Sequence, residues 1–120
     1  MSIITLILAG IVALEHLYIM YLETFATHSD TTSRVFNMSK EELQRESVTN
    51  LFKNQGIYNG LIAVFLLYGI FSNSQLLVTV FVLNVFFAAV YGAVTANKKI
   101  IFTQGGPAIL TLFSLIISLF

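Results

Sequence analysis

Residues 75–96 read QLLVTVFVLNVFFAAVYGAVTA, a stretch without a single charged side chain. The hydrocarbon core of a bilayer is about 30 Å thick, and an α-helix needs roughly 20 apolar residues to cross it. This stretch therefore predicts a transmembrane helix. Three more stretches have a similar composition, and the four predicted spans are residues 2–23, 54–71, 75–96 and 100–120.

The composition of the whole chain supports this interpretation. Of its 120 residues, 57% are hydrophobic and 10% are charged, whereas soluble domains carry about 25% charged residues. So few charged side chains cannot cover the surface that a soluble domain of this length exposes to water. We therefore exclude a soluble enzyme and a soluble binding module, and we expect an all-α integral membrane protein in contact with the lipid bilayer.

Charge balance and the absence of cysteine exclude further classes of protein. Six Lys and Arg residues balance six Asp and Glu residues, and there is no Cys. No basic stripe is present, so we expect no nucleic-acid partner. Thiolate ligands for zinc or iron–sulfur clusters are missing. His16 and His28 are twelve residues apart and lack the spacing of paired metal ligands, so we expect no metal site and no cofactor.

The positions of the cationic residues predict how the spans are oriented. Four lie between the first two spans and two between the last two: Arg34, Lys40, Arg45, Lys53, Lys98 and Lys99. Cytoplasmic loops of membrane proteins carry an excess of Lys and Arg. Both charged loops are therefore expected in the cytoplasm and both termini outside. Short connections favour an up-down four-helix bundle, which would form one domain over residues 1–120.

Residues 24–53 form the predicted cytoplasmic loop and hold most of the polar sequence. Ser39 and Glu42 have the spacing of a capping box, so a helix is expected to begin after Ser39. The apolar residues that follow suit a helix that runs into the second span. The pattern leaves open whether this helix is a bent surface helix or a cytoplasmic extension of that span, and a solvated connector is the simpler interpretation of the loop.

Polar side chains inside the spans are the candidate functional residues, because each costs free energy in lipid unless it meets a partner or water. Glu15 and His16 lie midway along the first span, and we interpret them as candidate catalytic acid/base residues. Other polar residues form one row on each predicted helix, mostly in the cytoplasmic half. We assign these to ligand binding: Tyr18, Glu23, Gln55, Tyr58, Asn59, Asn84, Tyr91 and Gln104.

Several of these polar residues also have a purely structural interpretation. Amides and hydroxyls in membranes bond between helices, with about 0.6 kcal/mol for each bond. We prefer this interpretation for Asn84, Thr111 and Ser118. Gly56 and Gly60 have the spacing of small residues that lets two helices approach closely, within one bundle or between protomers.

Residues 104–107, Gln-Gly-Gly-Pro, predict irregular backbone near the start of the fourth span. Pro107 has no N–H group, so the carbonyl of Thr103 loses its helical donor. Within a bilayer such backbone is tolerated only where protein or a cavity satisfies it. The break would position Gln104, and a simple helix start at Pro107 is the ordinary alternative.

Three clusters of residues resemble a known family. They are His16-Leu17-Tyr18-Ile19 with Leu22-Glu23, then Asn54-Gln55-Gly56-Ile57-Tyr58-Asn59-Gly60, then Gln104-Gly105-Gly106-Pro107-Ala108. Together they resemble the small bacterial integral membrane proteins grouped as domain of unknown function 1304. The resemblance covers essentially the whole chain. It implies four spans in a bacterial cytoplasmic membrane, and it implies no activity.

Three functions remain open on the sequence. We favour a polar intramembrane pocket, open to the cytoplasmic side, that binds a small lipophilic or amphiphilic ligand. Acid/base catalysis by Glu15 or His16 would make it an enzyme, which the sequence does not decide. A proton-coupled small transporter with Glu15 as the coupling carboxylate is the second function, and it requires a homo-oligomer because four spans are few for a transport path. A structural or regulatory membrane subunit is the third.

Overall fold

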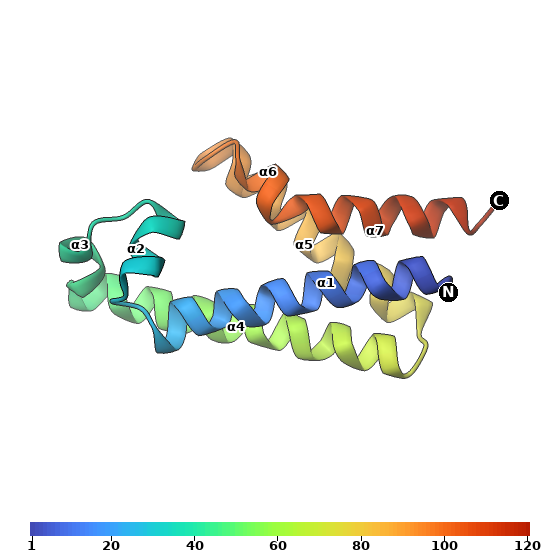
Figure 1. Ribbon diagram of the computed structural model, residues 1–120, viewed down its shortest axis with the longest axis horizontal. Helices are drawn as coiled ribbons and strands as arrows, with labels where there is room; N and C mark the ends of the chain where they lie inside the picture. Colours follow the sequence, from blue (N-terminus) through green and yellow to red (C-terminus); the bar gives the residue numbers. More distant parts are fainter. The chain divides into compact units, whose positions relative to one another are not determined.

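In the computed structural model all 120 residues are described, and every regular element is a helix. The elements in chain order are α1 (Ile3–Met20), the π-helical segment η1 (Tyr21–Phe25), α2 (Asp30–Phe36), α3 (Lys40–Gln44), α4 (Glu46–Phe71), α5 (Gln75–Thr95), α6 (Ile100–Thr103) and α7 (Gly105–Ile117) (Figure 1). The prediction of an all-α chain is confirmed.

Three helical stretches are long and apolar enough to cross a membrane. They are Ile3–Phe25, Glu46–Phe71 and Gln75–Thr95, and Gly105–Ile117 is a shorter apolar helix. The first three predicted spans therefore each coincide with a helix of sufficient length.

The chain divides into two compact units. Unit 1 comprises Met1–Glu15 and Ala63–Phe120, and unit 2 comprises His16–Ile62. Helices α1 and α4 each contribute residues to both units. The single domain expected from the sequence stays a prediction.

In unit 1, α5 packs against α6 and α7. Small residues bring these helices close together, since a Cβ atom at Gly105 would lie 3.2 Å from the Cβ atom of Ala89. A hydroxyl contact joins α1 to α7, with Thr5 Oγ1 and Ser114 Oγ 2.8 Å apart. The core of this unit consists of aliphatic side chains: Ala9, Val12, Ala13, Ala63, Leu66, Val78, Val82, Val85, Ala89, Ala108 and Leu115.

The fourth predicted span is interrupted near its start. The irregular backbone predicted near residues 104–107 is present, because residues 100–117 form α6 and α7 with Gln104 between them. Pro107 accounts for the interruption, because the carbonyl of Thr103 finds no N–H group four residues later. The helix resumes at Gly105 rather than at Pro107, which places the proline in the first turn of α7, where its missing N–H group is tolerated.

In unit 2, side-chain caps order the connection between η1 and α4. Ser29 Oγ accepts a hydrogen bond from the Thr32 N–H group at the start of α2, at 3.1 Å. Ser39 Oγ accepts from the Glu42 N–H group at the start of α3, also at 3.1 Å. The predicted N-cap at Ser39 is therefore confirmed. Helix α4 runs from Glu46 to Phe71, so the helix that contains the second predicted span begins eight residues earlier than residue 54, within the predicted loop.

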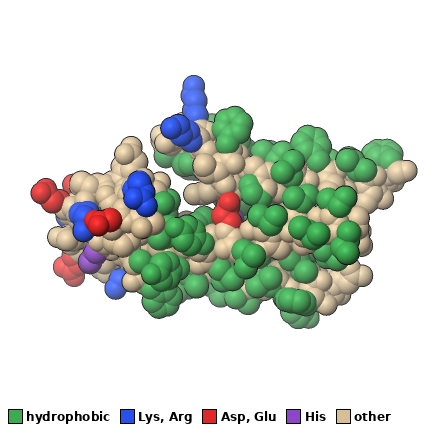
Figure 2. Space-filling view, viewed as in Figure 1, with side chains coloured by type: hydrophobic (Ala, Val, Ile, Leu, Met, Phe, Trp, Pro, Cys, Tyr) green, Lys and Arg blue, Asp and Glu red, His purple; other side chains and the backbone are tan.

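Most charged side chains gather over α2, α3 and the beginning of α4 (Figure 2). Two ion pairs form among them. Lys40 Nζ lies 2.8 Å from Asp30 Oδ1, and Arg45 Nη1 lies 3.2 Å from Glu42 Oε2. The predicted loop therefore contains two short helices, α2 and α3, whose N-termini are capped by serine side chains and whose charged residues form ion pairs.

Candidate functional site

A hydrogen bond between two polar side chains joins η1 to α4. Asn59 Nδ2 donates to Glu23 Oε1 at 2.6 Å. Glu23 is only 5% exposed, and Asn59 is partly buried. A buried carboxyl group is costly unless it is hydrogen-bonded, so this pair is the strongest candidate for a functional site in unit 2.

Glu23 lies in η1, where the chain departs from α-helical hydrogen bonding. The Ala26 N–H group donates to the carbonyl of Tyr21, five residues earlier, at 2.9 Å. A nearby threonine satisfies the backbone at the candidate site, since Thr27 Oγ1 donates to the Glu23 carbonyl at 2.6 Å. Short π-helical turns occur frequently at functional sites, and this one carries Glu23.

Two glycines allow α4 to lie directly against the segment that carries Glu23. A Cβ atom at Gly56 would collide with Thr24 Oγ1 and would lie 3.1 Å from Glu23 Cβ. A Cβ atom at Gly60 would collide with Met20 Sδ. The close approach predicted at both glycines is confirmed.

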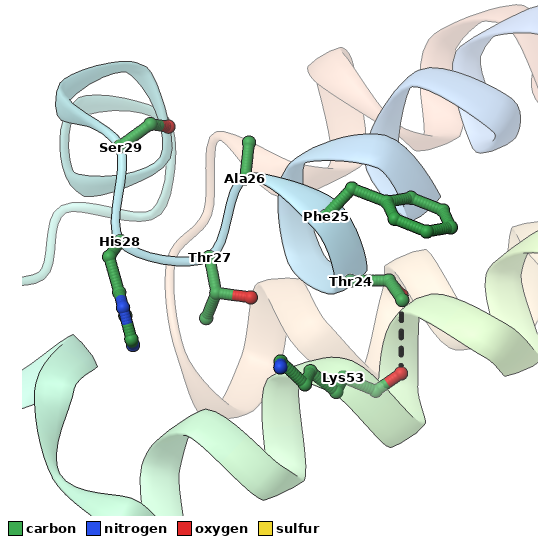
Figure 3. A pocket seen from close by; sticks show the side chains of 7 residues that line it. All are labelled: Thr24, Phe25, Ala26, Thr27, His28, Ser29 and Lys53. Carbon is green, nitrogen blue, oxygen red and sulfur yellow. Dashed lines mark hydrogen bonds between the residues drawn. The ribbon is translucent and has the colours of Figure 1, made fainter.

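The residues that follow Glu23 line an open pocket of about 250 Å³ (Figure 3). Thr24 Oγ1 donates to the Lys53 carbonyl at 3.2 Å, which holds the first lining residue against α4. His28 Nε2 lies 3.0 Å from Thr49 Oγ1, so α4 also contacts the far end of the lining. The complete lining is Thr24, Phe25, Ala26, Thr27, His28, Ser29 and Lys53.

Unit 2 contains six of the residues that the sequence singles out: His16, Tyr18, Glu23, Gln55, Tyr58 and Asn59. The structure brings Glu23 and Asn59 together in a direct hydrogen bond. His16 is buried, with 5% of its surface exposed. Tyr18, Gln55 and Tyr58 have exposed side chains and form no hydrogen bond with this pair.

Unit 1 contains the other four: Glu15, Asn84, Tyr91 and Gln104. Asn84 and Tyr91 are exposed on α5, and Gln104 is partly buried between α6 and α7. Glu15 Oε1 is buried and has no hydrogen-bond partner. No hydrogen bond connects any two of these four residues, so they do not form a cluster like that of Glu23 and Asn59.

The structural interpretation of the polar residues in unit 1 needs correction. Thr111 and Ser118 are expected to bond between helices, but each donates to a carbonyl of α7 itself, at Pro107 and Leu115. A serine or threonine hydroxyl reaches the carbonyl three or four residues earlier on its own helix. The hydroxyl contact between helices is made instead by Thr5 and Ser114.

Sequence reasoning missed the threonines and the lysine around Glu23. Thr24 and Thr27 bond to backbone carbonyls of unit 2, and Lys53 completes the pocket. The sequence feature that could have indicated them is the position of Thr24 and Thr27 at the end of an apolar stretch, where hydroxyl groups commonly bond to the last carbonyls of a helix. No group of three His, Asp or Glu side chains lies close enough together to hold a metal ion.

These observations define a small all-α protein with three candidate membrane spans and a carboxyl–amide pair between two of its helical segments. The chain belongs to the family described as "Protein of unknown function (DUF1304)", which matches residues 10–116. The resemblance noted in the sequence is therefore confirmed. The chain is 63% identical over 116 residues to the "Uncharacterized protein YpaA" of Lactococcus lactis subsp. lactis (strain IL1403), covering 95% of this chain and 98% of that relative. No solved structure matches the chain significantly.

Proposed function

We propose that this protein is a multi-pass membrane protein that binds the polar group of a small amphiphilic molecule at Glu23 and Asn59. The observation that carries the proposal is the 2.6 Å hydrogen bond to a carboxyl group that is 5% exposed. Buried polar pairs add little stability compared with apolar side chains of the same size. Ligand pockets typically combine apolar walls with a few such polar groups that fix the orientation of the ligand.

The positions of the cations support a site near the cytoplasmic surface. In the proposed topology, residues 100–120 form the fourth span in spite of the break at Gln104, since the 17 helical residues of α6 and α7 extend about 25 Å at roughly 1.5 Å each. The Lys and Arg residues in 24–53 and at 98–99 favour a cytoplasmic position for these segments and an outside position for both termini. Glu23 then lies near the cytoplasmic end of the first span of a bacterial cytoplasmic membrane protein.

A second candidate function rests on Glu15. Its Oε1 atom is buried and unpartnered, and ionisable groups within membrane spans commonly mark proton pathways. A proton-coupled transporter assembled as a homo-oligomer would use this carboxyl group, whereas an enzyme would use Glu15 or His16 as an acid/base. A structural subunit would need neither group.

Native mass spectrometry of the protein purified in a mild detergent tests the proposed ligand. We expect the wild-type protein to retain a small molecule in stoichiometric amount and Glu23→Gln to lose it, because the substitution keeps the size of the side chain and removes its acidic oxygen. Glu46→Gln is the matched control, since Glu46 is exposed at the start of α4. An empty wild-type protein would contradict the proposal and favour a structural subunit. Equal retention by Glu23→Gln would also contradict it, because the molecule would then bind at a site other than Glu23.

A further inference from the structure

We infer that the pocket lined by residues 24–29 and Lys53 binds a phosphate group. This inference does not rest on a ligand at Glu23 and Asn59, because it depends on other side chains and on the backbone. Three observations support it: an unpaired cation, two unpaired backbone donors, and the position of the pocket at the end of an apolar helix.

The unpaired cation is Lys53. It is the only Lys or Arg among the residues that line the pocket, and no carboxylate is present there. The ion pairs of the neighbouring helices are formed by other cations, Lys40 and Arg45. In Figure 3 the nitrogen of Lys53 points toward the stretch that carries Thr27 and His28. An ammonium group in this position attracts an anion and donates charge-assisted hydrogen bonds to it.

The backbone donors are the N–H groups of Thr27 and His28. Their neighbours are paired, since the Ala26 N–H group donates to Tyr21 and the Ser29 N–H group donates to Ala26. The N–H groups of Thr27 and His28 donate no hydrogen bond within the chain. Consecutive unpaired N–H groups in a turn bind anions, and Thr27 is buried, which makes an unpaired donor there costly.

The depth of the pocket suits a lipid phosphate. The candidate span ends at Phe25, whose side chain is 72% exposed, and the remaining lining residues follow it directly. Phospholipid headgroups lie immediately outside the hydrocarbon core that such a span crosses. Anionic lipids of the cytoplasmic leaflet are attracted to basic residues near the ends of spans. A soluble phosphate compound would use the same groups, and the experiment below separates the two sources.

Nuclear magnetic resonance of ¹⁵N-labelled protein in a maltoside detergent, which contains no phosphate, tests the inference. The titrants are dioleoyl phosphatidylglycerol, dioleoylglycerol as the same lipid without its headgroup phosphate, and inorganic phosphate. We expect the amide protons of Thr27 and His28 to shift downfield with phosphatidylglycerol and not with dioleoylglycerol. Equal shifts at similar concentrations of inorganic phosphate would identify a soluble phosphate compound as the ligand, and shifts with the lipid alone would identify a phospholipid.

Two variants decide whether Lys53 is part of this site. Lys53→Gln should weaken binding by about tenfold or more, because hydrogen bonds to charged groups are the strong ones. Its fold should be retained, since Lys53 is exposed and its contact with Thr24 uses the backbone carbonyl. Lys99→Gln removes the same charge from another exposed position and should bind like the wild type. Unshifted Thr27 and His28 amides with every phosphate titrant, or unchanged affinity in Lys53→Gln, would overturn the inference.

Discussion

Two hydrogen-bonding contacts between side chains of different helical segments, one in each unit of the molecule, differ in chemistry. In unit 1, Thr5 Oγ1 and Ser114 Oγ are 2.8 Å apart, and Ser114 also donates to the carbonyl of Thr111. In unit 2, Asn59 donates to the carboxyl group of Glu23 at 2.6 Å. Hydroxyl pairs can be replaced by apolar groups at little cost, whereas a carboxyl group is costly to bury. The comparison favours a structural role for the first contact and a functional role for the second.

The largest effect is expected from filling the space that lets α4 approach η1. Gly56→Leu should lower the free energy of unfolding by about 3 kcal/mol, at the upper end of the range for overpacked sites. Even its Cβ atom would collide with Thr24 Oγ1 and would press on Glu23 Cβ. Thermal or denaturant unfolding in detergent measures the change.

Gly10→Leu is the matched control in unit 1. No heavy atom lies within 4 Å of a Cβ atom built at Gly10, so the substitution should gain up to about 1 kcal/mol of helix propensity. Equal destabilisation by both substitutions would show that close approach at Gly56 is not what distinguishes the Glu23 contact.

Double-mutant cycles on the two polar contacts sharpen the comparison directly. Glu23→Ala with Asn59→Ala should give a coupling energy of about 1.5 kcal/mol, at the upper end of the range for a single hydrogen bond, because the bond is short and Glu23 is buried. Thr5→Ala with Ser114→Ala should give about 0.6 kcal/mol, the average for hydrogen bonds between membrane helices. Unfolding free energies of the four single and two double variants provide both values. Similar coupling energies would remove the energetic basis for treating the Glu23 contact as special.

The long apolar helices and the caps could be predicted because they depend on local sequence. A long uncharged stretch such as residues 75–96 has few structures available other than a helix. Ser39 caps α3 through a bond to a residue only three positions away. The break between α6 and α7 could be predicted from Pro107, but the point where the helix resumes could not. Gly105 begins α7 and packs against Ala89 and Ile101, so tertiary contacts contribute to that position.

The candidate site could be predicted only in part. Glu23 and Asn59 were both named from the sequence, because polar residues in apolar stretches are expected to have partners. That these two residues meet depends on the register between η1 and α4, which the contacts at Gly56 and Gly60 fix. The π-helical turn was not predicted, since its bonds between residues five apart follow from this packing rather than from a residue pattern.

The break in unit 1 provides a prediction of intermediate size. Pro107→Ala supplies an N–H group four residues after Thr103, so its carbonyl should gain a donor and α6 should join α7. We expect a gain of about 1 kcal/mol in the free energy of unfolding, the net value of one hydrogen bond. Slow hydrogen exchange of the new amide at position 107 would confirm the joined helix. An exposed, rapidly exchanging amide would mean that contacts at Gly105, and not the missing donor, impose the break.

The smallest effect is expected at the ion pair between α2 and α3. The hydrogen bond and charge of Lys40 hold the pKa of Asp30 below its ordinary value. A lowered pKa in the folded state stabilises the protein above the ordinary pKa of aspartate, and this contribution is lost as the pH falls through the lowered value. Both side chains are largely exposed, so solvent and salt screen the pair.

Lys40→Gln should therefore leave the free energy of unfolding at neutral pH almost unchanged and raise the pKa of Asp30, which a carboxyl ¹³C titration measures. If Lys40→Gln lowered the free energy of unfolding by more than the coupling energy between Glu23 and Asn59, the exposed ion pair would contribute more to the stability of unit 2 than the buried contact does. The Glu23–Asn59 contact would then no longer stand out energetically from the contact between Thr5 and Ser114.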